Sequence, residues 1–60
     1  MLIVKHNNDY YVGKFEIKGV VIMINHSSEK QDARRFKNMQ ELEEEMKNVE
    51  NYDYEIEEVK

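Results

Sequence analysis

The two histidines and the serines beside one of them are the first residues to consider for catalysis or metal binding. His6 stands beside Asn7, and His26 precedes Ser27 and Ser28. Histidine is a general base and a metal ligand, and serine becomes a nucleophile when an oriented base lies beside it. The two histidines fit no known metal-ligand or nucleophile spacing, and both fall in expected turns. We therefore expect structural or solvated histidines, no catalytic residue, no metal and no cofactor, and a chain that is not an enzyme.

A basic cluster is the second place where chemistry could occur, because cationic side chains bind the phosphates of nucleic acid. Its members are Lys30, Arg34, Arg35 and Lys37. Phe36, Tyr10 and Tyr11 could stack on bases. The chain is acidic overall, with a formal net charge of −4 and a pI of about 5.1. A nucleic-acid-binding regulator that uses residues 30–37 is therefore an alternative and not the first hypothesis.

Acidic residues dominate the C-terminal part of the chain. Residues 1–37 carry seven Lys or Arg against four Asp or Glu, whereas residues 38–60 carry two against nine. The two parts thus have net charges of +3 and −7, which sum to −4. Such a surface is either an ordinary solvated face or a site that docks on a basic groove of another protein. The candidate partner-binding residues on it are Glu41, Glu44, Glu45, Asp53, Glu55 and Glu57.

Three strands are expected to precede the basic cluster. Residues 2–5 are mostly apolar and lead into a run of turn formers, and residues 10–18 resume an extended segment that Gly13 interrupts, as a bulge or tight bend requires. Residues 14–18 alternate with period two, so Phe15 and Ile17 share one face, which predicts a half-buried strand. Residues 20–24 are apolar throughout.

Gly19 leaves the connection between these strands open. Lys18 and Gly19 could form a two-residue hairpin loop, or Gly19 could mark a kink within one long strand. Residues 29–37, which follow the third strand, are expected to form a turn or a short helical segment.

A helix and a last strand complete the expected fold. Asn38 followed by Glu41 is a variant of the capping box, and apolar residues at helical spacing then predict a helix over residues 39–49. Residues 52–57 alternate with period two and predict a strand. The fold class is therefore α+β, with one domain over residues 1–60: a small antiparallel sheet of three N-terminal strands and one C-terminal strand, with one α-helix packed on one face.

The size of the chain bears on its oligomeric state. A chain of 60 residues without cysteine lies near the lower limit at which one hydrophobic core suffices. Strands that are apolar on both sides need cover on both sides, and one helix covers only one face. We therefore expect a homodimer whose interface includes Val21, Met23 and Ile3. The alternative is a monomer on which these residues are exposed.

Ala33 to Phe36 lead into an acidic helix that contains Glu41 and Glu44, and residues 54–59 form an acidic, alternating C-terminal segment. This pattern resembles the small accessory proteins of Gram-positive phages and prophages, some of which inhibit host defence as CRISPR inhibitors or Hachiman anti-defence proteins. The resemblance covers residues 33–59 well and the N-terminal hairpin loosely. Its motif is structural, so it assigns a role to no single residue.

The resemblance implies a short protein that binds and inhibits a host protein through protein contacts. It also implies a cytoplasmic location, which agrees with the lack of signal-peptide features at residues 1–4. The longest apolar run, residues 20–24, is too short to cross a membrane, so no membrane role is expected. A structural component is a third alternative.

Overall fold

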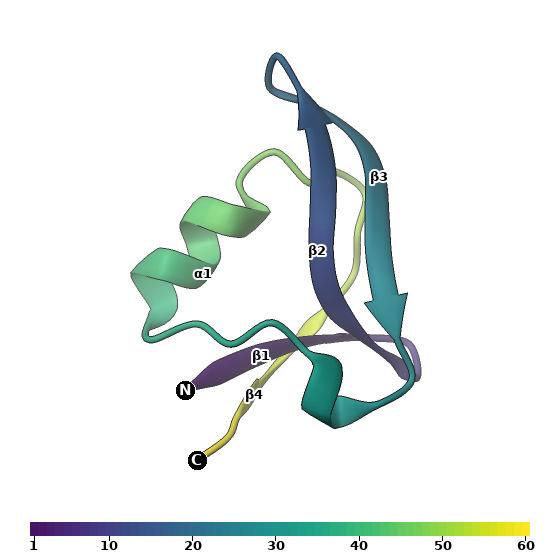
Figure 1. The fold of residues 1–60 in the computed structure, drawn as a ribbon. Coiled ribbons are helices and arrows are strands. Elements are labelled where there is room, and N and C mark those ends of the chain that lie inside the picture. The colour runs from purple at the N-terminus through teal and green to yellow at the C-terminus, as the bar shows by residue number, and fades with distance from the viewer.

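The computed structural model describes residues 1–60 and contains a four-stranded antiparallel sheet with a helix on one face (Figure 1). The strands are β1 (Leu2–His6), β2 (Asp9–Ile17), β3 (Val20–Ser27) and β4 (Glu55–Glu58), while the short 3-10 helix η1 (Lys30–Asp32) and the helix α1 (Met39–Met46) lie between β3 and β4 in sequence. The order in the sheet is β3-β2-β1-β4, so β3 and β4 are the edge strands. The predicted α+β fold, with three N-terminal strands, one C-terminal strand and one helix, is confirmed.

Two-residue loops join the first three strands. Asn7 has a φ of 56°, and Lys18 and Gly19 have φ values of 49° and 81°. Ile17 pairs directly with Val20, so Lys18 and Gly19 form the whole loop between β2 and β3. Positive φ at both central residues matches the right-handed twist of a hairpin, and glycine adopts it at little cost. Of the two alternatives for Gly19, the hairpin loop is therefore correct.

The segment before α1 fills a gap between β1 and β2. These two strands pair only near their shared loop, at the C-terminal end of β1. Closer to the N-terminus, Leu2 and Phe36 exchange two backbone hydrogen bonds of 2.8 Å, and the amide of Arg34 donates to the carbonyl of Tyr11 at 3.0 Å. Residues 34–36 thus satisfy backbone groups that the diverging strands leave free.

Helix α1 begins as the sequence predicts and ends earlier. The side-chain oxygen of Asn38 accepts a hydrogen bond from the amide of Glu41 at 2.9 Å, and the Glu41 carboxylate accepts one from the amide of Lys37 at 3.3 Å. The helix ends at Met46 instead of residue 49, because the chain turns there, with the amide of Val49 bound to the carbonyl of Met46. Strand β4 is likewise shorter than residues 52–57 and starts at Glu55.

The core lies between the sheet and α1. Its fully or almost fully buried members are Val4, Tyr11, Phe36, Leu42 and Met46. Burial of a large aliphatic or aromatic side chain contributes about 1.5–3 kcal/mol to the free energy of folding, so these five residues account for much of the stability of so short a chain.

Ile3 alternates with Val4 and lies on the other face of β1, yet it is also 0% exposed. Glu57 pairs across from Ile3, and its carboxylate forms an ion pair with Lys30 of η1, so the segment around η1 lies over this face. Ile3 is therefore enclosed within one chain and offers no surface to a second copy. The prediction that Ile3 belongs to a dimer interface is corrected.

Candidate functional site

The far end of the β2–β3 hairpin carries a set of exposed apolar side chains. Phe15 pairs with Met23, and Ile17 pairs with Val20. Residues paired across two strands point to the same face of a sheet, so all four side chains share one face. We call this set the outer apolar face, and its exposed fractions are Phe15 56%, Ile17 50%, Val20 60% and Met23 58%.

Charged side chains occupy the opposite face of the same hairpin, toward α1. The ammonium group of Lys14 donates to the carbonyl oxygen of Glu45 in α1 at 2.6 Å. Lys14 also lies 3.0 Å from the carboxylate of Glu16, and its side chain is only 12% exposed. The hydrogen bond from Lys14 lowers the pKa of the Glu16 carboxyl. The predicted alternation is thus present over residues 14–17, because Lys18 belongs to the loop. Lys14 and Glu16 lie on the helix side and the apolar side chains face outward, the reverse of an ordinary half-covered sheet.

A β-bulge explains why the faces are reversed. The pairing of β2 with β3 shifts between Tyr11 and Gly13, which leaves Val12 as an extra residue. Side chains alternate along a regular strand, so Phe15 would share the face of the buried Tyr11 if the strand were regular. The extra residue inverts the alternation and turns Phe15 away from the core.

A second register shift lies farther along the hairpin, opposite the link between Phe15 and Glu16, where Ile22 is the extra residue. Val21 pairs with Glu16 and therefore lies on the helix side, half-buried, whereas Met23 lies on the outer apolar face. The sequence prediction placed Val21 and Met23 in one interface, and the register places them on opposite faces. It missed Phe15, Ile17 and Val20, although Gly13 gave a signal for the bulge that exposes the first two.

Glu45 points into the structure and does not belong to an acidic surface. The hydroxyl of the buried Tyr11 donates to the Glu45 carboxylate at 2.6 Å, and the Arg34 guanidinium lies 3.4 Å from the same oxygen. Burial raises the pKa of the Tyr11 phenol, and the hydrogen bond to Glu45 raises it further. The prediction that Glu45 forms part of a partner-binding acidic face is therefore corrected, because its carboxylate joins α1 to the sheet.

The other predicted acidic residues do not form one continuous site. Glu41 and Glu44 are exposed on α1, while Asp53 and Glu55 are exposed at the start of β4. Glu57 is half-buried and paired with Lys30. The acidity of the C-terminal segment is thus divided between two elements.

Two of the four predicted basic residues are paired within the chain. Lys30 binds Glu57, which raises the pKa of Lys30. Arg34 binds Glu45 and lies 5.5 Å from the centre of the Phe36 ring. Arg35 and Lys37 have no ion pair, and the Arg35 guanidinium is 3.5 Å from the carbonyl oxygen of Lys60. This pairing reduces the positive charge available to a phosphate backbone.

The two histidines, distant in sequence, meet around Tyr52. The ring centre of His6 is 4.2 Å from that of Tyr52, and the His26 ring is 5.7 Å away on a similar tilt. Nδ1 of His6 donates to the carbonyl of Asp53, and Nε2 of His26 is 2.7 Å from the Tyr52 hydroxyl. These contacts hold Tyr52 and Asp53, which follow α1, against the C-terminal ends of β1 and β3, so the two histidines have a structural role.

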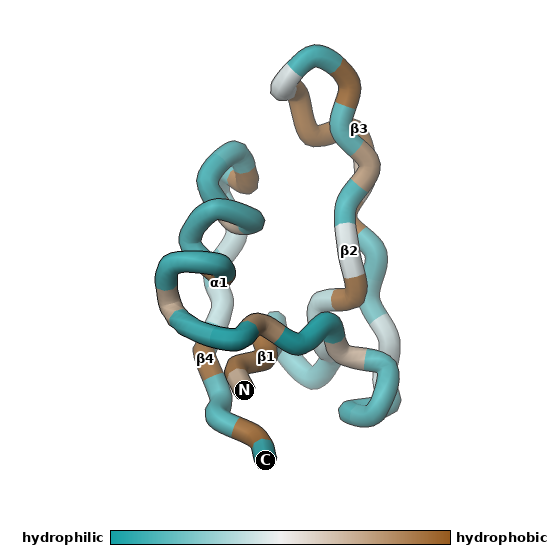
Figure 2. Tube along the Cα trace, turned by 60° about the vertical axis from the view of Figure 1, so that its left-hand side comes forward, coloured by the Kyte–Doolittle hydropathy of each residue, from teal (hydrophilic) through white to brown (hydrophobic).

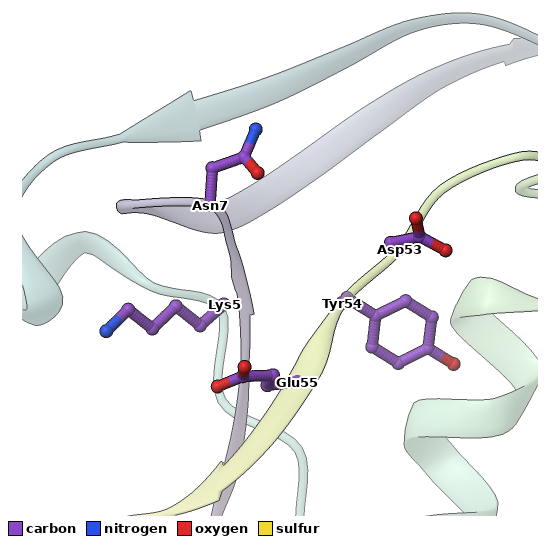
Figure 3. Close-up of a pocket in the computed structure, with 5 residues that line it drawn as sticks. All are labelled: Lys5, Asn7, Asp53, Tyr54 and Glu55. Atoms are coloured by element: carbon purple, nitrogen blue, oxygen red, sulfur yellow. The ribbon is translucent and has the colours of Figure 1, made fainter.

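A hollow of about 340 Å³ lies near the start of β4 and is lined by Lys5, Asn7, Asp53, Tyr54 and Glu55 (Figure 3). The side chains point in different directions, with Tyr54 turned toward the helix and Lys5 turned away from it. They do not converge on one point, so the hollow does not present a set of groups to one ligand.

Comparisons with known proteins gave no match: a scan of protein-family models, a search of curated proteins and a search of solved structures were all negative. Neither helix of the structure has the length and apolar character needed to cross a bilayer.

Proposed function

We propose that this chain is a non-catalytic protein-binding module that uses the outer apolar face of its β2–β3 hairpin. One observation carries this proposal: four large apolar side chains are at least half exposed on one sheet face, while Lys14 and Glu16, which alternate with Phe15 and Ile17 along β2, lie on the side of α1. A contiguous apolar patch on a small protein marks an interaction surface, because side chains left in water contribute nothing to the folding of the isolated chain, whereas a partner that covers them gains their burial free energy.

The proposed role is inhibition of a host protein in the cytoplasm. This role rests on the resemblance of residues 33–59 to phage accessory proteins, some of which block host defence. The net charge of −4 favours a partner with basic residues around the site that receives the hairpin. Binding of this kind requires no cofactor.

A quantitative capture experiment in a Gram-positive host tests the proposal. The tagged chain is compared with the variants Phe15→Glu and Met23→Glu, which place a charge on the outer apolar face. Met39→Glu is the matched control, because Met39 is 44% exposed but lies on α1. We expect a specific partner to be captured by the wild type and by Met39→Glu, and to be lost from both hairpin variants, whose circular dichroism should be unchanged.

Two results would contradict the proposal. The first is retention of the partner by both hairpin variants. The second is capture of nucleic acid that weakens steeply with salt and disappears when Arg35 and Lys37 are reversed in charge, which would favour the nucleic-acid alternative. Binding through an apolar face should weaken far less with salt than binding to phosphates, because only the charges around the face are screened.

A further inference from the structure

We infer that, in the free protein, a second copy of this chain covers the outer apolar face, with two hairpins packed face to face about a two-fold axis. The inference rests on the proposed function, because it names an occupant of the same face. The interface buries the four residues of the outer apolar face and leaves Ile3 and Val21 outside it.

The outer apolar face can pack against itself. A two-fold interface brings the same patch of both copies together, so the patch must be complementary to its own surface. The face consists of two adjacent cross-strand pairs, Phe15 with Met23 and Ile17 with Val20. None of the four side chains is charged or polar, so two copies meet without burying an unpaired charge.

The area of the face suits a stable dimer. At 50–60% exposure, each of the four side chains presents on the order of 100 Å² to water, or about 400 Å² per copy. Covering these side chains in both copies removes about 800 Å² from water, and the polar rim that surrounds the apolar core of an interface adds to this area. Specific and stable interfaces bury about 1,200–2,000 Å².

The arrangement of the elements leaves the face accessible. Helix α1 lies on the opposite side of the hairpin, where it receives Lys14, and the hairpin tip extends beyond the helix (Figure 1). Figure 2 shows the same hairpin standing apart from α1 at its far end, with apolar positions along it. Two hairpins can therefore approach at the usual separation of packed sheets, about 10 Å, without contact between the two helices.

Face packing explains the exposure better than pairing of two edge strands. Phe15 and Ile17 are on β2, which lies inside the sheet between β3 and β1. Side-by-side pairing of two β3 strands would extend the sheet and leave these two residues exposed. Packing face to face covers the apolar residues of both strands at once.

Light scattering across a dilution series tests the inference. We expect the wild type to have a mass near twice 7.3 kDa at micromolar concentration. Phe15→Glu and Met23→Glu should raise the dissociation constant by at least about 100-fold, because each substitution acts in both copies. Met39→Glu should leave the constant within about threefold of the wild type. Phe15→Ala serves as a milder variant if a glutamate variant fails to fold, and should also weaken the dimer.

Isotope-filtered NMR of a mixed dimer then identifies the interface. Face packing predicts contacts between the Phe15 ring of one copy and the Met23 methyl group of the other. A wild-type mass of 7.3 kDa at all concentrations would overturn the inference, as would intermolecular contacts confined to the backbones of two β3 strands. If such a monomer still loses its captured partner when Phe15 is changed to Glu, the proposed function stands and only the second copy is excluded.

Discussion

The hydrogen bond between Tyr11 and Glu45 should add measurably to the attachment of α1 to the sheet, beside the burial of Leu42 and Met46. The Tyr11 side chain is fully buried, and its hydroxyl lies 2.6 Å from a carboxylate whose side chain is 15% exposed. Hydrogen bonds to charged groups contribute a net of about 1.5–3 kcal/mol. Tyr11→Phe keeps the ring and removes only the donor, so it should lower the free energy of unfolding by about 2 kcal/mol.

Such a loss is large for this chain and simple to measure. A core of this size supplies about 3–5 kcal/mol in total, so the variant should retain about half of the stability. With a urea dependence of about 1 kcal/mol per molar for a small protein, the midpoint of unfolding should fall by about 2 M. The measurement is best made in the Met23→Glu background, so that dimerisation does not contribute to the midpoint.

A double-mutant cycle separates this bond from other effects. Glu45→Gln keeps an acceptor for Tyr11 but loses the charge and the ion pair with Arg34, which is half exposed and worth less than about 1 kcal/mol. We expect the Tyr11→Phe and Glu45→Gln effects to be coupled by about 1 kcal/mol. Glu44→Gln, one position earlier and exposed, is the control and should change stability by less than about 0.5 kcal/mol. An unchanged midpoint for Tyr11→Phe, or strict additivity, would refute the reasoning.

Three further predictions concern pH, the helix cap and the hairpin loop. Burial raises the pKa of Tyr11 in the folded state above its ordinary value of 10.0, so the stability that the protonated phenol contributes should be complete below pH 10 and decline as the pH rises further. The urea midpoint of the wild type should therefore fall between pH 9 and about 11, and that of Tyr11→Phe should fall less. Asn38→Ala removes the side chain that caps the Glu41 amide and should lower the free energy of unfolding by about 0.5–2 kcal/mol, whereas Asn38→Asp should retain it. Circular dichroism during thermal unfolding distinguishes the two variants, and equal melting temperatures for both would contradict the capping role. Gly19→Ala should lower the free energy of unfolding by about 1 kcal/mol, because the φ of Gly19 is 81°. Gly13→Ala should cost less, because no atom lies within 4 Å of the added carbon. A lower urea midpoint for Gly13→Ala than for Gly19→Ala would contradict the loop geometry.

Several local elements of this fold could be predicted because their causes lie within a few residues. Asn38 caps the helix through the amide three residues later, so the start of α1 is determined by short-range backbone chemistry. The sequence left open whether Lys18 and Gly19 form a loop or a kink, and the pairing of Ile17 with Val20 decided for the loop. Alternation along residues 14–18 likewise determined that Phe15 and Ile17 share a face. These signals were sufficient for the order of the strands and the helix along the chain and for the fold class.

Tertiary structure decided which of those faces is buried. Alternation relates neighbouring side chains to each other but not to the core, and a single extra residue at Val12 inverts the relation between Tyr11 and Phe15. The sequence pattern likewise does not show that Glu45 is enclosed. Its position in the helix is compatible with exposure to solvent, and only the folded structure places the Tyr11 hydroxyl of β2 against its carboxylate. Whether a side chain is available to a partner depends on pairing between segments distant in sequence, and for this chain that pairing exists only in the folded sheet.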